Sequence, residues 1–169
     1  MKEEKVLENA TVCFLFKENK VLLALKTRKI GEGFWNGYGG GIEKGETQEE
    51  GAIRELKEET GGVIAKDLEK IAIIDFHNKK SDKQEFVCRV HFYLVREWVG
   101  EVKEVKEMIN PTWFDIENLP LDKMMPADRE FLPIALRGQK VIGKAYLGPF
   151  QKKSLKPVEI EYVDSFPAE

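Results

Sequence analysis

The feature that most constrains this chain is a glycine-rich stretch followed directly by a segment crowded with glutamates. Residues 27–46 read TRKIGEGFWNGYGGGIEKGE, with seven glycines in twenty positions, which predicts a loop. Residues 54–62 read RELKEETGG and place Glu55, Glu58 and Glu59 on about one and a half turns of a helix. Glu55 and Glu59 form a like-charge pair at i,i+4 spacing, which by itself costs roughly 0.2–0.5 kcal/mol. A fold that keeps this segment must therefore offset the repulsion.

These glutamates belong to a helix predicted over residues 48–60. Thr47 is a suitable N-cap, Glu50 completes a capping box, and Gly61-Gly62 supply a left-handed stop. At about 100° per residue, the three glutamates fall on one arc at the edge of the apolar face. The apolar face consists of Ala52, Ile53 and Leu56. The side expected to face solvent carries Glu50, Arg54 and Lys57. The helix is therefore expected to pack on a sheet with its carboxylates at the rim of the contact.

Two interpretations of the acidic arc are open. It is either a solvated acidic face, with Arg54 and Lys57 offsetting part of the repulsion, or a set of ligands for a hard divalent cation. Mg²⁺ in proteins takes a few carboxylates and keeps its other positions for water and substrate phosphate oxygens. A neighbouring glycine loop lets backbone groups approach a metal and a phosphate closely. The combination favours a Mg²⁺ site, with Mn²⁺ as the alternative ion, and makes a purely structural role the least expected.

The remaining segments predict an α/β fold with one mixed sheet and two helices. No internal repeat, linker or low-complexity stretch divides residues 1–169, which are expected to form a single domain. The apolar runs 10–17 and 20–26 predict a hairpin. Further strands are predicted over residues 70–76, 85–98, 112–115, 141–147 and 158–163. A second helix is predicted over residues 128–137, with Pro133 able to kink or delay it.

Charge and composition narrow the class of protein. The formal net charge is −3 and the isoelectric point about 5.6, so the sequence encodes no general attraction to nucleic acid or acidic membranes. The apolar run near the N-terminus is too short to span a bilayer and lacks the features of a signal peptide, which favours a cytoplasmic protein. Cys13 and Cys88 are expected to be reduced core residues, and two histidines without a CxxC motif argue against structural zinc. A monomer is expected.

The stretch GGIEKGETQEEGAIRELKEETGG, residues 40–62, resembles the Nudix box. It departs from the motif only at Gly62, where the family usually has an aliphatic residue. The matching positions are Gly40, Glu46, Arg54, Glu55, Leu56, Glu58, Glu59 and Gly61. The segments KTRKIGEGFWNGYGG, KEMINPTWFDIENLP and KMMPADREFLPIAL are similar, in order and spacing, to animal-type oxidised purine nucleoside triphosphatases, the 8-oxo-dGTP diphosphatases of the MutT-like group. The resemblance implies a Nudix fold, an α/β/α sandwich around a mixed sheet.

The resemblance also implies a metal site and catalytic residues at the matching positions. The implied metal ligands are the backbone carbonyl of Gly39 and the side chains of Glu55, Glu58, Glu59 and Glu107. Family enzymes cleave nucleoside triphosphates with Mg²⁺, and Glu58, Glu59 and Glu107 each remain open as the acceptor of the proton of the attacking water. Arg54 would orient the helix carboxylates through a salt bridge, and Glu46 would support the loop. For Glu107 the alternative is an ordinary solvated loop acid.

The same resemblance implies which residues contact the nucleotide. They are Thr11, Lys26, Asn36, Tyr38, Gly39, Gly40, Gly41, Met125 and Asp128, with Ile30, Phe76 and Met108 as further pocket-lining or simply core positions. Lys26 would contact the triphosphate and Asn36 the purine edge; the alternatives are a surface lysine and a turn-forming asparagine. Met125 and Ala127 stand where the relatives have a tryptophan and the first of two aspartates. Only Asp128 remains of that pair, and its alternative role is N-cap of the second helix. These departures predict weaker stacking and relaxed or redirected base selection.

The expected function is Mg²⁺-dependent release of pyrophosphate from a nucleoside triphosphate, with an oxidised purine such as 8-oxo-dGTP as the substrate that the resemblance suggests. One alternative is hydrolysis of another nucleoside diphosphate derivative, such as an ordinary dNTP, ADP-ribose or a dinucleotide. The other is a non-catalytic nucleotide-sensing module. Such modules usually carry a damaged acidic helix, whereas all three helix acids are present here.

Overall fold

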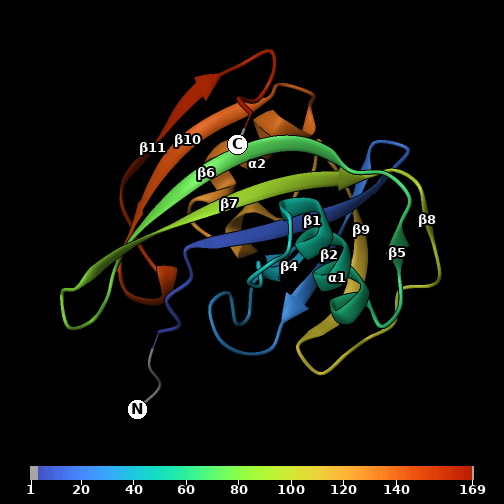
Figure 1. Ribbon diagram of the computed structural model, residues 1–169, viewed down its shortest axis with the longest axis horizontal. Helices are drawn as coiled ribbons and strands as arrows, with labels where there is room; N and C mark the ends of the chain where they lie inside the picture. The colour runs from blue at the N-terminus through green and yellow to red at the C-terminus, as the bar shows by residue number, and fades with distance from the viewer. Residues whose placement is uncertain (1–3, 169) are drawn as a thin grey trace.

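The computed structural model describes residues 4–168 and shows a mixed β-sheet with two α-helices (Figure 1). The strands are β1 (Asn9–Lys17), β2 (Lys20–Lys26), β3 (Trp35–Asn36), β4 (Tyr38–Gly41), β5 (Ile64–Ala65), β6 (Glu69–Lys79), β7 (Glu85–Val95), β8 (Trp98–Val99), β9 (Met108–Asp115), β10 (Val141–Leu147) and β11 (Ser154–Tyr162). The α-helices are α1 (Gln48–Thr60) and α2 (Asp128–Leu136), and the short 3-10 helices are η1 (Leu121–Lys123) and η2 (Pro149–Gln151). The predicted α/β class is confirmed.

The main sheet is mixed because two of its strand pairs are parallel. Its order is β11-β10-β6-β7-β1-β2-β3, with β4 also paired to β1 and β9 paired to β2. β1 runs parallel to β7 and β10 runs parallel to β6, whereas the hairpins β1–β2 and β6–β7 are antiparallel. In the antiparallel pair of β1 with β4, Thr11 lies opposite Gly40 and Val12 opposite Gly39. This register carries the glycines of β4 to the side of helix α1.

The sheet carries one helix on each face, with α1 in front of it and α2 behind it in Figure 1. Helix α1 buries Ala52 and Leu56 in a cluster that includes Tyr38 of β4. Helix α2 buries Phe131 and Leu132 in the second cluster, on the opposite side of the sheet. Each cluster removes one apolar helix face from water, which is the main favourable contribution to folding. The sandwich implied by the resemblance is confirmed.

Helix α1 begins and ends as the sequence predicts. The Thr47 side chain accepts a hydrogen bond from the Glu50 N–H at 3.1 Å, and the Glu50 carboxylate accepts one from the Thr47 N–H at 2.9 Å. Gly61 ends the helix with φ 74, and its N–H donates to the carbonyl of Lys57. The chain therefore satisfies both ends of the helix that carries the glutamates.

The glycine-rich stretch is not simply a loop, so that prediction is wrong. It contains strands β3 and β4, and Gly39 to Gly41 pair with β1. A Cβ atom on Gly39 would lie only 1.8 Å from the carbonyl oxygen of Thr11. The missing side chains are thus what allows β4 to pair so closely, and a composition typical of loops builds a strand here.

Other elements differ from the predictions in their extent. The strand predicted over residues 85–98 is two strands, β7 and β8, and β8 pairs with β5, which was not predicted. Strand β9 begins at Met108, within the segment expected to be a loop, and β11 begins at Ser154. The differences arise because pairing partners, and not local composition, decide where a strand ends.

Helix α2 begins at Asp128, but its N-cap is Ala127 and carries no side-chain cap, so the interpretation of Asp128 as N-cap is wrong. Pro133 lies inside the helix and does not delay its start. Cys13 and Cys88 are buried free thiols, as predicted. Neither of the helices within residues 4–168 has the length and apolar composition needed to cross a membrane.

Thr47→Ala removes the hydroxyl that accepts the Glu50 N–H at the start of α1. We expect the free energy of unfolding, measured with urea, to fall by about 1 kcal/mol. Thr47→Ser keeps an acceptor at the same place and is the matched control. An equal loss in both variants would contradict the assignment of this stabilisation to the cap.

Candidate active site

Four glutamates from two parts of the chain line one pocket beside helix α1. The pocket has a volume of about 270 Å³ and is lined by Arg28, Glu55, Glu58, Glu59, Val105, Lys106 and Glu107. The side chain of Glu55 is only 16% exposed, whereas that of Glu58 is 59% exposed. Glu107 comes from the segment directly before β9. The structure therefore brings together the glutamates that the sequence proposed as metal ligands. We call this cavity the acid pocket.

Glu59 lies against strand β4, where its Oε1 accepts the N–H of Gly39 at 2.8 Å. Burial raises the pKa of the Glu59 carboxyl to about 7, although the Gly39 hydrogen bond and the charge of Lys26 lower it. Burial also lowers the pKa of Lys26, against the opposing charges of Glu59 and Glu107. Lys26 is therefore a half-buried cation beside the acids and not an ordinary surface lysine. The Gly39 carbonyl as a metal ligand stays a prediction.

Arg54 lies at the centre of a hydrogen-bond network that joins the glycine strand to α1. Its Nε donates to Glu46 at 2.6 Å, one terminal nitrogen donates to the carbonyl of Gly41 at 2.9 Å, and the other to Glu55 at 2.9 Å and to Glu58 at 3.4 Å. Its side chain is only 22% exposed, so placing it on the solvent side of the helix was wrong. The long side chain bends back over the loop, which a helical projection cannot show. Its hydrogen bond holds the pKa of Glu46 at about 2.

Glu107 is paired with two cations from the segment after β2. It forms a close ion pair with Arg28, whose Nε also donates at 2.9 Å, and the Lys29 ammonium lies 3.6 Å away. The Arg28 hydrogen bond lowers the pKa of Glu107. Glu107 is therefore not an ordinary solvated loop acid. Sequence reasoning missed Arg28 and Lys29; the signal was the basic run TRK directly after a strand that ends at the site.

The carboxylates fit a divalent cation by their chemistry. As the side chains stand, no three His, Cys, Asp or Glu residues between positions 4 and 168 form a group that could hold a metal ion. The acids are held instead by Arg28, Arg54 and the Gly39 N–H. Four carboxylates around one pocket are nevertheless the hard oxygen donors that Mg²⁺ and Mn²⁺ take. One of them, Glu59, is half-buried with a raised pKa, which is the environment that a cation would relieve.

The glycines of β4 place backbone where side chains would otherwise stand. A Cβ atom on Gly40 would lie 2.6 Å from the carboxyl carbon of Glu55. Tyr38, in contrast, is 1% exposed and belongs to the core under α1. Gly40 therefore bears directly on the position of a pocket carboxylate, whereas Tyr38 supports the strand from below.

The residues expected to contact the base lie on several elements of the fold and do not line the acid pocket. The Asn36 amide donates to the carbonyls of Phe34 at 2.9 Å and Gly31 at 3.4 Å, which holds the turn before β3. Thr11 is fully buried on β1, and its hydroxyl has no hydrogen-bond partner within the described residues. Burial raises the pKa of Asp128 to about 7. Of the further pocket-lining positions, Phe76 and Met108 are buried in the two cores and Ile30 is half-buried.

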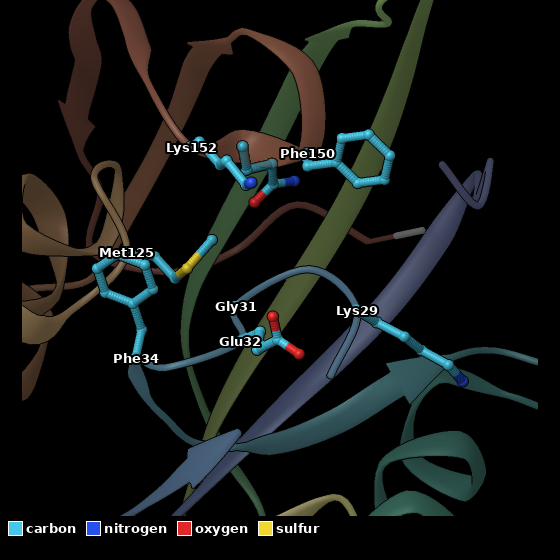
Figure 2. A pocket seen from close by; sticks show the side chains of 8 residues that line it. Lys29, Gly31, Glu32, Phe34, Met125, Phe150 and Lys152 are labelled. Carbon is cyan, nitrogen blue, oxygen red and sulfur yellow. The ribbon is translucent and has the colours of Figure 1, made fainter. Parts of the chain in front are cut away.

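A second cavity lies between the glycine stretch and η2 (Figure 2). Its volume is about 390 Å³, and Met125 is the one base-contact residue expected from the sequence that lines it. The lining residues are Lys29, Gly31, Glu32, Phe34, Met125, Phe150, Gln151 and Lys152. We call it the ring cavity. The contribution of η2 was not predicted, because no residue pattern marks residues 149–151 as part of a site.

Comparisons with known proteins agree on one family. The NUDIX domain model matches residues 6–134. The chain is 36% identical over 138 residues to an oxidized purine nucleoside triphosphate hydrolase of Danio rerio, covering 79% of this chain and 82% of that protein. It is 35% identical over 133 residues to the protein of the same name from Mus musculus, with the same shares covered. A solved MutT protein from Bacillus halodurans has a TM-score of 0.76 at 23% identity, covering 92% of this chain and 98% of that one, which shows the fold.

Gly40→Ala places a methyl group 2.6 Å from the Glu55 carboxyl carbon and must displace that carboxylate. We expect the affinity for Mn²⁺, measured by titration calorimetry, to fall at least about tenfold. The matched control is Gly41→Ala, whose methyl group meets only the flexible Leu7 side chain at 3.0 Å. Equal Mn²⁺ affinities in the two variants would contradict a role for Glu55 in cation binding.

Asp128→Asn tests the half-buried carboxyl at the start of α2. Because the folded pKa is raised to about 7, Asp128 stabilises the wild type fully below its ordinary pKa and loses that contribution as pH rises through 7. We expect the unfolding free energy of the wild type, relative to Asp128→Asn, to fall between pH 4 and pH 8 by no more than about 4 kcal/mol. Exposed Asp122, changed to Asn, is the control. A pH-independent difference between wild type and Asp128→Asn would show that the carboxyl is not buried.

Proposed function

We propose that this chain, which belongs to the NUDIX domain family, hydrolyses a nucleoside triphosphate to the monophosphate and pyrophosphate in a Mg²⁺-dependent reaction. It is a hydrolase of the phosphoanhydride bonds of a nucleotide, as its curated relatives are. The Mg²⁺-dependent release of pyrophosphate is proposed from the acid pocket, which four glutamates line beside the glycines of β4.

The residues around the acid pocket suit a polyphosphate with its cation. Glu55, Glu58, Glu59 and Glu107 would hold Mg²⁺, which when bound neutralises phosphate charge and lowers the pKa of a water molecule. Lys26, Arg28 and Lys29 line or adjoin the same pocket and supply further positive charge for phosphate oxygens. The net charge of the whole chain is −3 and four carboxylates line the pocket, so a bound cation would have to supply the excess positive charge that attracts the substrate.

The three glutamates that could accept a proton from water differ in the contacts that already engage their carboxylates. Glu59 is oriented by the Gly39 N–H, and Glu107 is engaged by Arg28 and Lys29. Glu58 is the most exposed of the three, and it accepts a hydrogen bond from Arg54 at 3.4 Å. We infer that Arg54 acts as a positioning residue, because it contacts Glu55 and Glu58 while being anchored by Glu46.

For the base, we propose an oxidised purine such as 8-oxo-dGTP. Two relatives at 35–36% identity carry the name oxidized purine nucleoside triphosphate hydrolase, and the coverage of both chains supports a shared substrate class. Met125 is 6% exposed and lines the ring cavity at the position where the resemblance expects a tryptophan, so a thioether would pack on the ring in its place. We propose that the protein acts as a monomer without nucleic acid or membrane.

Glu59→Gln removes a carboxylate from the acid pocket while keeping its size. We expect the rate of Mg²⁺-dependent pyrophosphate release to fall by about two orders of magnitude or more. The rate is measured by separating and quantifying the products. Glu49→Gln changes an exposed glutamate on the same helix and should leave the rate near that of the wild type. Near-normal turnover in Glu59→Gln would contradict the assignment of the acid pocket.

A panel of 8-oxo-dGTP, dGTP, dCTP and ADP-ribose, with Mg²⁺ and identified products, tests the substrate class. We expect pyrophosphate release from 8-oxo-dGTP to have the highest kcat/KM. A higher kcat/KM for ADP-ribose would support the alternative nucleoside diphosphate substrate. Thermal stabilisation by a nucleotide without any product would support the sensing module.

A further inference from the structure

We propose that the ring cavity holds the purine of the substrate and that Gln151 selects purines whose edge offers one hydrogen-bond donor beside one acceptor. The inference rests on the proposed function, because it concerns the base of the same nucleotide. It assigns base selection to η2, a segment that the sequence did not mark as part of the site.

The ring cavity has the size and lining of a site for a flat aromatic ring. Its volume of about 390 Å³ falls within the range of roughly 300–1,000 Å³ that small-molecule sites occupy. Figure 2 shows Met125 and Phe34 together on one side of the cavity, Phe150 on another, and Glu32 at its edge. Aromatic and thioether side chains at the walls favour stacking on a ring, and the polar side chains that can fix its orientation are Lys29, Glu32, Gln151 and Lys152.

Lys29 connects the ring cavity to the acid pocket. Its side chain lines the ring cavity, and its ammonium lies 3.6 Å from the Glu107 carboxylate of the acid pocket. In Figure 2 the Lys29 side chain extends from the glycine stretch toward helix α1. A nucleotide whose phosphates lie at the acid pocket therefore reaches the ring cavity along Lys29, which identifies the occupant of the cavity as the base of that nucleotide.

The η2 segment is held in an unfavourable backbone conformation at the wall of the cavity. Phe150 has φ 56 and Gln151 has φ 58, both in the left-handed region that residues other than glycine rarely adopt. Two contacts with buried side chains hold it there: the Phe150 N–H donates to Glu4 at 3.0 Å, and the Gln151 Nε2 donates to Asn78 Oδ1 at 3.0 Å. Strain of this kind persists where surrounding structure imposes it, and it clusters at ligand sites.

The contact with Asn78 fixes which way the Gln151 amide faces. Asn78 uses its own nitrogen to donate to the carbonyl of Phe76 at 3.0 Å, so its oxygen must be the acceptor toward Gln151. Asn78 is 2% exposed and cannot turn over without losing both bonds. Gln151 then has one N–H and its carbonyl oxygen for a ligand in the cavity, because an amide carries two N–H donors and one acceptor oxygen.

A donor beside an acceptor distinguishes among purines. In the major-groove edge of adenine, the 6-amino group donates and N7 accepts, whereas in guanine both O6 and N7 accept. Oxidation of guanine at carbon 8 places a proton on N7, so that O6 accepts and N7 donates. The fixed Gln151 amide complements 8-oxoguanine with two hydrogen bonds, and it complements adenine only when the ring is turned over, because the donor and the acceptor of adenine stand in the reverse order. Unmodified guanine leaves one acceptor facing another in either pose. We infer that this contrast discriminates against the unmodified nucleotide.

The test is equilibrium binding of nucleoside monophosphates, measured by titration calorimetry on the full chain. We expect 8-oxo-dGMP and dAMP to bind at least about tenfold more tightly than dGMP, as for a good pair of hydrogen bonds to a base edge. In Gln151→Leu, the affinities for the three ligands should lie within about threefold of one another, mainly because 8-oxo-dGMP and dAMP bind more weakly. Gln84→Leu, at an exposed glutamine in the β6–β7 turn, is the matched control and should keep the wild-type order.

Because leucine adopts the left-handed conformation poorly, Gln151→Asn is the second variant. Asparagine tolerates that conformation but is too short to keep both the Asn78 bond and the ligand contact, so it should lose the preference with little change in thermal unfolding. An equal affinity of the wild type for dGMP and 8-oxo-dGMP would overturn the proposal, as would an unchanged preference in both variants. The absence of pyrophosphate release from any nucleoside triphosphate would overturn the proposed function instead, since monophosphate binding does not require turnover.

Discussion

The site depends on the close approach of the three consecutive glycines of β4 to strand β1 and helix α1. β4 brings Gly39 against the backbone of β1 and Gly40 against the carboxylate of Glu55, at separations that no Cβ atom would permit. The same strand presents the Gly39 N–H to Glu59. Glycine in a strand costs conformational entropy and contributes no packing, so the sheet gives up local stability at this point. In return, two half-buried carboxylates gain a fixed position on the rim of α1.

The negative charge of the pocket glutamates must also be balanced. Arginine side chains provide part of this balance, in addition to any metal ion that binds. Glu55 and Glu58 are offset by Arg54, and Glu107 by Arg28, so the repulsion within RELKEETGG is relieved by the protein itself. The interpretation that a metal alone justifies the acidic arc is thus too narrow. A cation entering the acid pocket competes with guanidinium groups for the same oxygens, and this competition moderates its affinity.

Much of the fold could be predicted because helix ends and apolar periodicity are local properties. Thr47, Glu50 and Gly61 determine the bounds of α1, and alternating apolar residues determine β10. The strand character of Gly39–Gly41 could not be predicted, since it exists only through pairing with β1. In the site, the three pocket glutamates of α1 were found from their spacing, and Glu107 from the family resemblance. The roles of Arg28 and of η2 were missed, because both depend on contacts between segments far apart in the sequence.

The contact between Glu4 and Phe150 joins residues 146 positions apart in the chain. It can therefore form only after η2 has been synthesised. Every residue that lines the acid pocket lies before position 108, so all of its side chains are synthesised before η2. The wall of the ring cavity forms only after residues 149–151 have left the ribosome and met the opposite end of the chain. The side chains of the charged centre are therefore synthesised before the segment that we propose to choose the base.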